Sequence, residues 1–327
     1  MVLDMPKYCK WKANTILHNY SVTPAATQII ADHTIVADYD NIPAEYMTAV
    51  KKMMVAFPGE SHSEAYRTGM ELLEASNATY ACNVGTGEAY TDEYVRVEHY
   101  GAGESLGEAI WYTWYAYDGH NGTNKDIVKN YIAEYVSHNH AINVLGFGWC
   151  WDMTWINDPT ETKDSVYGCG WAGASDGGPD DNLPWGLDSA DSEITGNRVC
   201  MDTYLGATQD YINYCTLNSY STKVVFTTGP VDSFDGENGY QRYIKDTYLR
   251  NYVLADSTRI LFDYADILCY DDNGQQTTTT WDGHTYPVIT TTNLGDGSIG
   301  HIGSAGCIRL AKAQWWLLAR IAGWNGN

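Results

Sequence analysis

Basic residues are scarce in this sequence. Its 327 residues include 19 Lys and Arg against 41 Asp and Glu, a formal net charge of −22, and no basic cluster offsets the excess. Such a charge repels phosphate backbones and anionic lipid headgroups, which excludes nucleic acid as an expected partner. Apolar runs also stay short of the ~18 residues that a transmembrane helix needs, so we expect no membrane insertion.

Recognisable cysteine motifs are absent as well. The eight cysteines are scattered, with no C-x-x-C and no paired Cys/His spacing, which argues against structural zinc, c-type haem and a thioredoxin-like site. An even count is compatible with up to four disulfides outside the cytosol, and free buried thiols are the alternative. The Asp- and Gly-rich loops 176–182 and 232–238 offer oxygen ligands for calcium, but neither has EF-hand spacing. We predict no required metal or cofactor.

Phenylalanine is rare, with 5 residues against 12 Trp and 26 Tyr. Rings with a polar edge suit surfaces that stack on sugars or pack against other subunits, although ordinary core packing accounts for most of them. Sequons for N-glycosylation begin at Asn19, Asn77 and Asn121. The first residues have no signal-peptide pattern, so either a signal was removed or the chain is not exported. We predict a secreted or cell-surface glycoprotein.

Apolar runs typical of buried parallel strands alternate with helical patterns along the chain. The alternation predicts one α/β domain over 1–327, in which helices cover both faces of a mostly parallel sheet. Residues 1–47 are interpreted as a lead-in, 156–200 as a long surface loop insertion, and 271–284 as a loop or edge hairpin. The expected strands are 53–57, 141–148, 223–227 and 259–265, and the expected helices are 43–51, 62–76, 123–138, 237–254 and 307–324.

Glycines and polar residues follow three of these strands, where ligands of parallel sheets bind. Ser61 follows strand 53–57 at a helix N-terminus, where free N–H groups and the helix dipole favour a developing oxyanion. It is a candidate nucleophile, or a helix cap. Trp149, Trp151 and Asp152 follow strand 141–148 and suit a sugar, or form a tight turn with core tryptophans. Asp232 follows strand 223–227, and His62 adjoins Ser61.

A serine nucleophile needs a general base, and His301 is the candidate. It lies in a glycine-rich segment directly before the last predicted helix, and Asp296 precedes it by five residues. Asp296 could hold the imidazole in the tautomer that accepts the serine proton. A histidine in a glycine loop is otherwise ordinary polar surface.

Together these segments resemble the SGNH (GDSL-type) hydrolases over residues 50–325. The resemblance implies a flavodoxin-like three-layer sandwich, a serine esterase active on ester bonds, Ser61, His301 and Asp296 as the triad, and Ser61 and Gly148 N–H groups as the oxyanion hole. The chain is also similar to a group of exported microbial proteins with Ser-His after the first strand and an ending like Trp315–Trp324. The four matching blocks are Gly59-Glu60-Ser61, Gly146 or Gly148, Gly229-Pro230-Val231-Asp232, and His301–Ala313.

Two positions depart from that family pattern. Val231 stands where the third block has an asparagine that donates to the oxyanion, and losing such a donor costs ~10²–10³ in rate. Position 298 is Ser, where the family has its triad aspartate three residues before the histidine. Asn143 or a loop residue is the alternative oxyanion donor.

Three functions are therefore expected, in order. The first is an extracellular serine esterase that deacylates a polysaccharide or other acylated carbohydrate, with His62, Trp149, Trp151, Asp152 and Asp232 binding substrate. The second is an inactive structural or carbohydrate-binding protein that self-assembles into a filament or surface layer, or binds sugar through Trp149, Trp151, Trp155, Trp171 and Trp185. The third is a glycoside hydrolase using Asp152 and Asp232.

Overall fold

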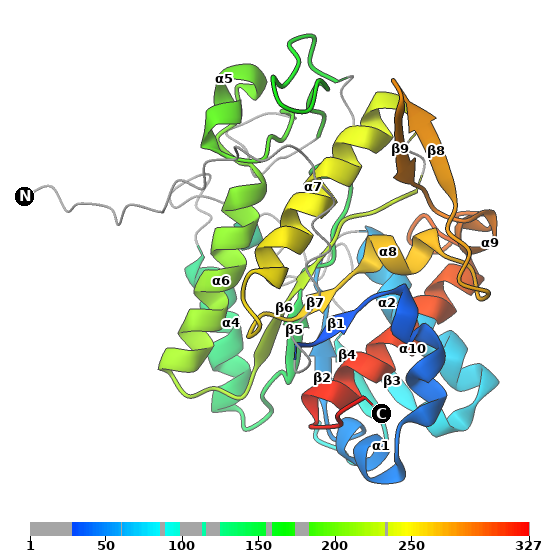
Figure 1. The fold of residues 1–327 in the computed structure, drawn as a ribbon. Coiled ribbons are helices and arrows are strands. Elements are labelled where there is room, and N and C mark those ends of the chain that lie inside the picture. Colours follow the sequence, from blue (N-terminus) through cyan, green and yellow to red (C-terminus); the bar gives the residue numbers. More distant parts are fainter. Residues whose placement is uncertain are drawn as a thin grey trace, which may run out of the picture.

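A seven-stranded parallel sheet lies at the centre of the protein (Figure 1). The computed structural model describes residues 28–59, 61–85, 89–98, 113–115, 125–154, 159–173, 183–232 and 235–326. The strands lie in the order β1-β7-β6-β5-β2-β4-β3, and each neighbouring pair is parallel. They are β1 (Ile30–Ala31), β2 (Met54–Ala56), β3 (Cys82–Gly85), β4 (Val95–Glu98), β5 (Val144–Gly146), β6 (Lys223–Thr227) and β7 (Leu261–Phe262).

The strand order confirms the predicted α/β sandwich and fixes where a ligand would bind. Without the edge strands β1 and β3, the order β4-β2-β5-β6-β7 is that of a flavodoxin-like sheet. The chain winds from β2 to β4 in one direction and then resumes with β5 on the other side of β2. The topological switch point is therefore between β2 and β5, and ligands of such sheets bind beyond the strand ends there.

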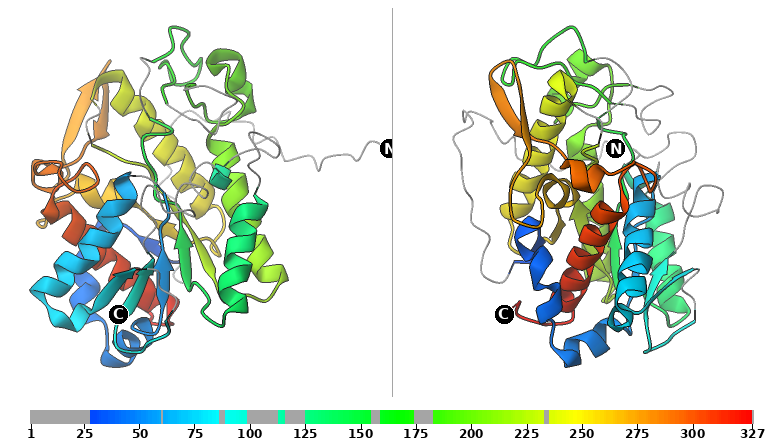
Figure 2. Two further views of the ribbon diagram at one scale, coloured as in Figure 1. Left: turned by 180° about the vertical axis from the view of Figure 1, so that it is seen from behind. Right: turned by 90° about the vertical axis from the view of Figure 1, so that its right-hand side faces the viewer.

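Helices cover both faces of the sheet, as Figures 1 and 2 show from three directions. Alternate strand residues feed two separate cores: Val55 packs on one face, and Met54 and Ala56 pack on the other. One layer holds η1 (His33–Asn41), α1 (Ala44–Val50), α2 (Ser61–Ser76), α8 (Tyr264–Cys269) and α10 (Ser304–Ile321), and the other holds α4 (Asp126–Ser137), α6 (Met201–Leu217) and α7 (Gly236–Leu254).

The remaining elements are short. The predicted edge hairpin near 271–284 is a separate antiparallel pair, β8 (Thr278–Trp281) and β9 (His284–Pro287), beside α7. The predicted strand 259–265 is shorter than expected, because Asp263 caps α8 by accepting a hydrogen bond from Asp266 N at 3.1 Å. Small helical turns complete the fold: η2 (Ala78–Tyr80), η3 (Ser189–Asp191), α5 (Ser192–Thr195) and α9 (Thr291–Leu294).

The insertion 156–200 is packed into the domain where the structure describes it, which corrects the expectation of a surface loop. Trp171 and Trp185 are fully buried in the α4/α6/α7 core. The ammonium of Lys245 on α7 donates to the carbonyls of Met153 and Ala172, the latter at 2.7 Å. Burial lowers the pKa of Lys245 to about 7. Helix α7 therefore holds the backbone just before the insertion, at Met153, and within it, at Ala172.

All seven described cysteines are free thiols, and Cys9 lies outside the described residues. The disulfides considered from the cysteine count therefore do not form among those seven. Burial raises the pKa of six of these thiols. The pKa rises to about 12 for Cys169 and Cys307. No helix in the described part of the chain is both long enough and apolar enough to cross a bilayer.

Candidate active site

The β2 and β5 strand ends meet through two glycines. Gly59 and Gly148 form a parallel bridge, and Gly148 N–H donates to Pro58 O at 2.9 Å. A Cβ at Gly59 would lie 1.7 Å from Gly148 O, and one at Gly148 would lie 2.5 Å from Ser63 Cβ. This close approach places Ser61, the first residue of α2, at the switch point of the sheet.

We predict that Gly59→Ala destabilises the fold by about 2 kcal/mol, since a methyl group there overpacks two backbones that have no room to separate. Chemical denaturation measures the change. Gly206→Ala is the matched control, because a Cβ on that α6 glycine meets nothing within 4 Å and alanine favours a helix by up to about 1 kcal/mol. Equal stability of the two variants would contradict this reading of the glycine contact.

His301 reaches the same place from a tight turn before α10. Ile299 and Ile302 exchange backbone hydrogen bonds of 3.0 and 3.1 Å. Gly300 and His301 between them have φ values of 53° and 67°, as in a type I′ turn. A Cβ at Gly300 would lie 2.5 Å from Ser61 O, so only glycine lets this turn pack against α2. Positive φ is uncommon for a residue other than glycine, and histidine is among those that adopt it more readily.

The predicted nucleophile and base lie within hydrogen-bonding distance. Ser61 Oγ is 2.8 Å from His301 Nε2. Burial, and then the neighbouring His62, lower the pKa of His301 below its ordinary value. The imidazole is therefore neutral at pH 7, with Nε2 able to accept the Ser61 proton, which is the arrangement a serine nucleophile requires.

Asp296 does not hold His301, which corrects the predicted triad acid. Its exposed carboxylate accepts hydrogen bonds from Ser298 N at 3.2 Å and Ser298 Oγ at 2.7 Å. These bonds lower its pKa and direct it into its own turn. Among the described residues, no carboxylate makes a hydrogen bond to His301.

A buried carboxylate lies one ring away from His301. Asp232 Oδ1 is 2.7 Å from His62 Nε2, and both side chains are 1% exposed. Asp232 Oδ2 accepts from Trp151 Nε1 at 3.2 Å. The His62 and Trp151 rings both lie beside His301, at centroid distances of 4.8 and 4.2 Å. The structure thus brings His62, Trp151 and Asp232 together around the base, but the burial of His62 and Asp232 corrects their predicted role in binding substrate.

The structure retains only one of the two backbone N–H groups predicted to form the oxyanion hole. Ser61 N–H begins α2 and has no acceptor among the described residues, so it is available as the predicted donor to an oxyanion. Gly148 N–H is already bonded to Pro58 O, which corrects its assignment as the second donor. Val231 is buried in the core. Asn143 lies at the opposite end of β5, where its side chain accepts from Met54 N, so it does not replace the missing donor.

Trp149 and Asp152 lie in the interior, which corrects their assignment to substrate binding. Trp149 is 2% exposed and donates from Nε1 to Thr227 O at 2.8 Å. Asp152 is equally buried and accepts from Tyr115 OH at 2.7 Å and Cys150 N at 3.1 Å. Both residues support the loop that carries Trp151.

Two further residues, which were not predicted from the sequence, adjoin the site. Cys150 Sγ lies 3.4 Å from Ser61 Oγ. Glu64, one turn into α2, accepts from Gly300 N at 3.3 Å and so ties the His301 turn to this helix. The helical spacing of Ser61 and Glu64 was visible in the sequence, but nothing there indicated that residue 300 packs beside them.

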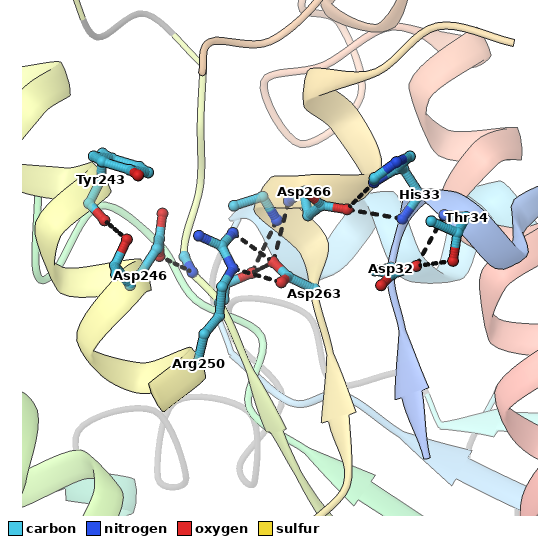
Figure 3. A network of polar contacts seen from close by, with 12 residues as sticks. Asp32, His33, Thr34, Tyr243, Asp246, Arg250, Asp263 and Asp266 are labelled. Carbon is cyan, nitrogen blue, oxygen red and sulfur yellow. Dashed lines mark hydrogen bonds and ion pairs between the residues drawn. The ribbon is translucent and has the colours of Figure 1, made fainter. Parts of the chain in front are cut away.

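A second polar cluster lies at the carboxyl ends of β1 and β7 (Figure 3). Asp32, His33 and Asp266 could each offer one ligand atom to a metal ion, and these atoms lie within 4.8 Å of one another. His33 Nδ1 and Asp266 Oδ2 are already paired at 2.5 Å, a bond that raises the pKa of His33 against its partial burial. His33 also lines a cavity of about 460 Å³ between η1 and α10 that includes none of the Ser61 site residues.

Loop 176–182, considered for calcium from the sequence, lies outside the described residues, as do Trp155 and residues 233 and 234 of the second loop, 232–238. The absence of a metal requirement stays a prediction. Comparison of this chain with protein-family models and with curated proteins finds no match.

Proposed function

We propose that the protein is an extracellular serine esterase of the SGNH type that deacylates a carbohydrate polymer. The observation that carries the proposal is the 2.8 Å contact between Ser61 Oγ and His301 Nε2 at the N-terminus of α2. A serine cap of a helix needs no histidine, so this pairing favours the nucleophile over the cap. The location at the switch point of the sheet agrees with it.

The geometry supports a two-step acyl transfer. Ser61 Oγ attacks the ester carbonyl carbon while His301 Nε2 takes the hydroxyl proton, and Ser61 N–H at the helix terminus stabilises the oxyanion. The oxyanion collapses, the C–O bond to the alcohol breaks, and His301 gives its proton to the departing alcohol. Water then attacks the acyl-serine as His301 takes its proton, and the acid leaves when that proton returns to Ser61 Oγ.

The net charge of −22 and the partly exposed indole of Trp151 support the substrate class. A strongly acidic protein repels polyanionic polymers, whereas acetyl esters on neutral sugars carry no charge. An indole beside the base offers a flat surface for a pyranose ring. The prediction that the protein is exported, and the glycosylation sequons in its sequence, agree with an extracellular substrate.

The test is covalent labelling of the folded protein with a fluorophosphonate probe. We expect labelling of the wild type and its complete loss in Ser61→Ala. Ser63→Ala is the matched control in the same helical turn, because Ser63 is buried and its Oγ accepts from Arg67 at 2.8 Å. Labelled protein that also releases acetate from an acetylated polysaccharide would support the esterase. A folded wild type that does not label would contradict it.

A structural protein without catalysis is the second candidate, favoured by the engagement of Gly148 N–H and by buried Val231. These leave Ser61 N–H as the one oxyanion donor identified among the described residues. Trp149, Trp171 and Trp185 are buried, which removes most of the predicted sugar-binding tryptophans. Ordered polymers of purified protein in negative-stain microscopy, together with absent labelling, would favour this role.

The glycoside hydrolase alternative loses its basis. Asp152 and Asp232 are 2% and 1% exposed, and both oxygens of each are bonded to neighbouring side chains or backbone. Such carboxylates are not placed to protonate a glycosidic oxygen or to activate water.

A further inference from the structure

We propose that Asp232 is the residue that positions His301, and that it acts through the rings of His62 and Trp151 rather than by direct contact. The inference rests on the proposed function and adds a positioning residue to it. It concerns a carboxylate on the β6 loop that the Ser61–His301 pair itself does not touch.

The three rings and one carboxylate form a closed set of contacts. Asp232 binds His62 through one oxygen and Trp151 through the other. The two rings lie 5.5 Å apart, edge to face, and each packs on His301. Rotation of the His301 ring away from Ser61 would have to displace one of these neighbours, and both are anchored to the same buried acid.

The position of Asp232 makes this anchoring strong. It is 1% exposed, and water does not compete for its oxygens there. The bond to His62 Nε2 requires that nitrogen to donate, and the buried Nδ1 of His62 has no partner among the described residues. His62 is thereby held in one orientation, which makes it a rigid neighbour for His301.

The charge of Asp232 also acts on the base. The groups that influence His301 from the elements packed around it are His62 and Glu64 on α2 and Asp232 on the β6 loop. The two carboxylates favour the protonated imidazole, and His62 opposes it. Asp232 therefore supplies negative charge that stabilises the imidazolium formed during acyl transfer.

The test compares Asp232→Asn with Asp296→Asn by NMR titration of the His301 ring, assigned from a His301→Asn sample. In Asp232→Asn we expect the His301 midpoint to fall by about one pH unit, because a favourable charge is removed. Asp296→Asn should leave it unchanged. The pH at half-maximal fluorophosphonate labelling should shift downward with it, and the plateau rate should fall by about 10- to 100-fold, as for other residues that orient a functional group.

Trp151→Phe keeps a ring against His301 but loses the indole N–H, so we expect an intermediate loss of labelling rate. A purely structural role of Asp232 would lower the plateau without moving the midpoint, and that result would overturn the proposal. Midpoint and plateau changes in Asp296→Asn instead of Asp232→Asn would also overturn it. The wild type could fail to react with the probe while Asp232→Asn still shifts the His301 midpoint. That combination would contradict the esterase function but would support the coupling of Asp232 to His301.

Discussion

Ester hydrolysis is expected to fall by about 10²–10⁴-fold in His301→Ala, the range that a positioned general base contributes. The imidazole is the one base that hydrogen-bonds to Ser61 Oγ among the described side chains. Without it, the hydroxyl at the α2 terminus keeps its proton at neutral pH. Initial rates with an activated acetate ester, measured with folded protein, give the loss directly.

The same group sets the pH dependence. Only neutral His301 accepts the serine proton, so activity is present above its pKa and is lost as the pH falls through it. Because burial lowers that pKa from 6.5, the half-maximal rate should occur below pH 6.5. His138→Ala, an exposed histidine at the end of α4, is the matched control and should leave the profile unchanged. A wild-type midpoint above pH 7 would disagree with this assignment.

Arg250→Ala is expected to reduce the free energy of unfolding by about 3 kcal/mol, the lower end of the range for breaking a buried ion pair. Arg250 Nε and Nη2 donate to the two oxygens of Asp263 at 2.6 and 2.7 Å, which Figure 3 shows at the end of β7. Asp263 is 5% exposed as a side chain and also accepts from Thr228 Oγ1. Removing the guanidinium leaves this charge buried without its counterion.

Two comparisons separate the ion pair from general side-chain loss. Arg198→Ala removes an exposed arginine and should change stability by less than about 0.5 kcal/mol. The double variant Arg250→Ala with Asp263→Asn should lose less than the sum of the single losses, because the second change removes the uncompensated charge. Urea denaturation measures the wild type, the single variants Arg250→Ala, Asp263→Asn and Arg198→Ala, and the double variant. Additive losses would show that the two groups do not stabilise each other.

The central strands could be predicted because both of their faces are buried. Val224, Val225 and Phe226 form an uninterrupted apolar run, which identifies a buried strand without knowledge of the fold. Strand β4 has Arg96 and Glu98, both buried, and Glu98 accepts from Tyr135 OH at 3.0 Å. In the sequence, these two charged residues indicate an exposed segment, because the α4 tyrosine that bonds to Glu98 cannot be identified without the fold. Strand β1 has two residues, too few for a period.

Helix α6 was missed for a related reason. Its buried face includes Thr208 and Cys215 among tyrosines, and Thr208 is satisfied by donating to Tyr204 O while accepting from Trp114 Nε1. A face built from hydrogen-bonded polar residues gives a weak apolar stripe. The helix is nevertheless 17 residues long and packs against β6.

The candidate site, too, could be predicted from the sequence only in part. Ser61 and His301 could be paired from sequence because one follows a strand, the other precedes the last helix, and nucleophile and base are a known combination. The carboxylate beside the base could not be identified from the sequence, because Asp296 and Asp232 are distinguished only by the residues that contact them in the folded protein. Two residues of separation let Asp296 bond to Ser298, whereas Asp232 finds His62 across 170 positions of chain. Proximity in sequence favoured the wrong carboxylate.

The pairing of β1 with β7 has a consequence for how the chain is made. Ile30 and Ala31 pair in parallel with Leu261 and Phe262, so the first described strand has its only described neighbouring strand far downstream in the sequence. During translation β1 and β6 leave the ribosome before β7, so each of them has an unpaired edge until β7 has emerged. The sheet cannot be completed before that point, and a chain that stops short of β7 exposes strand edges that are prone to aberrant association.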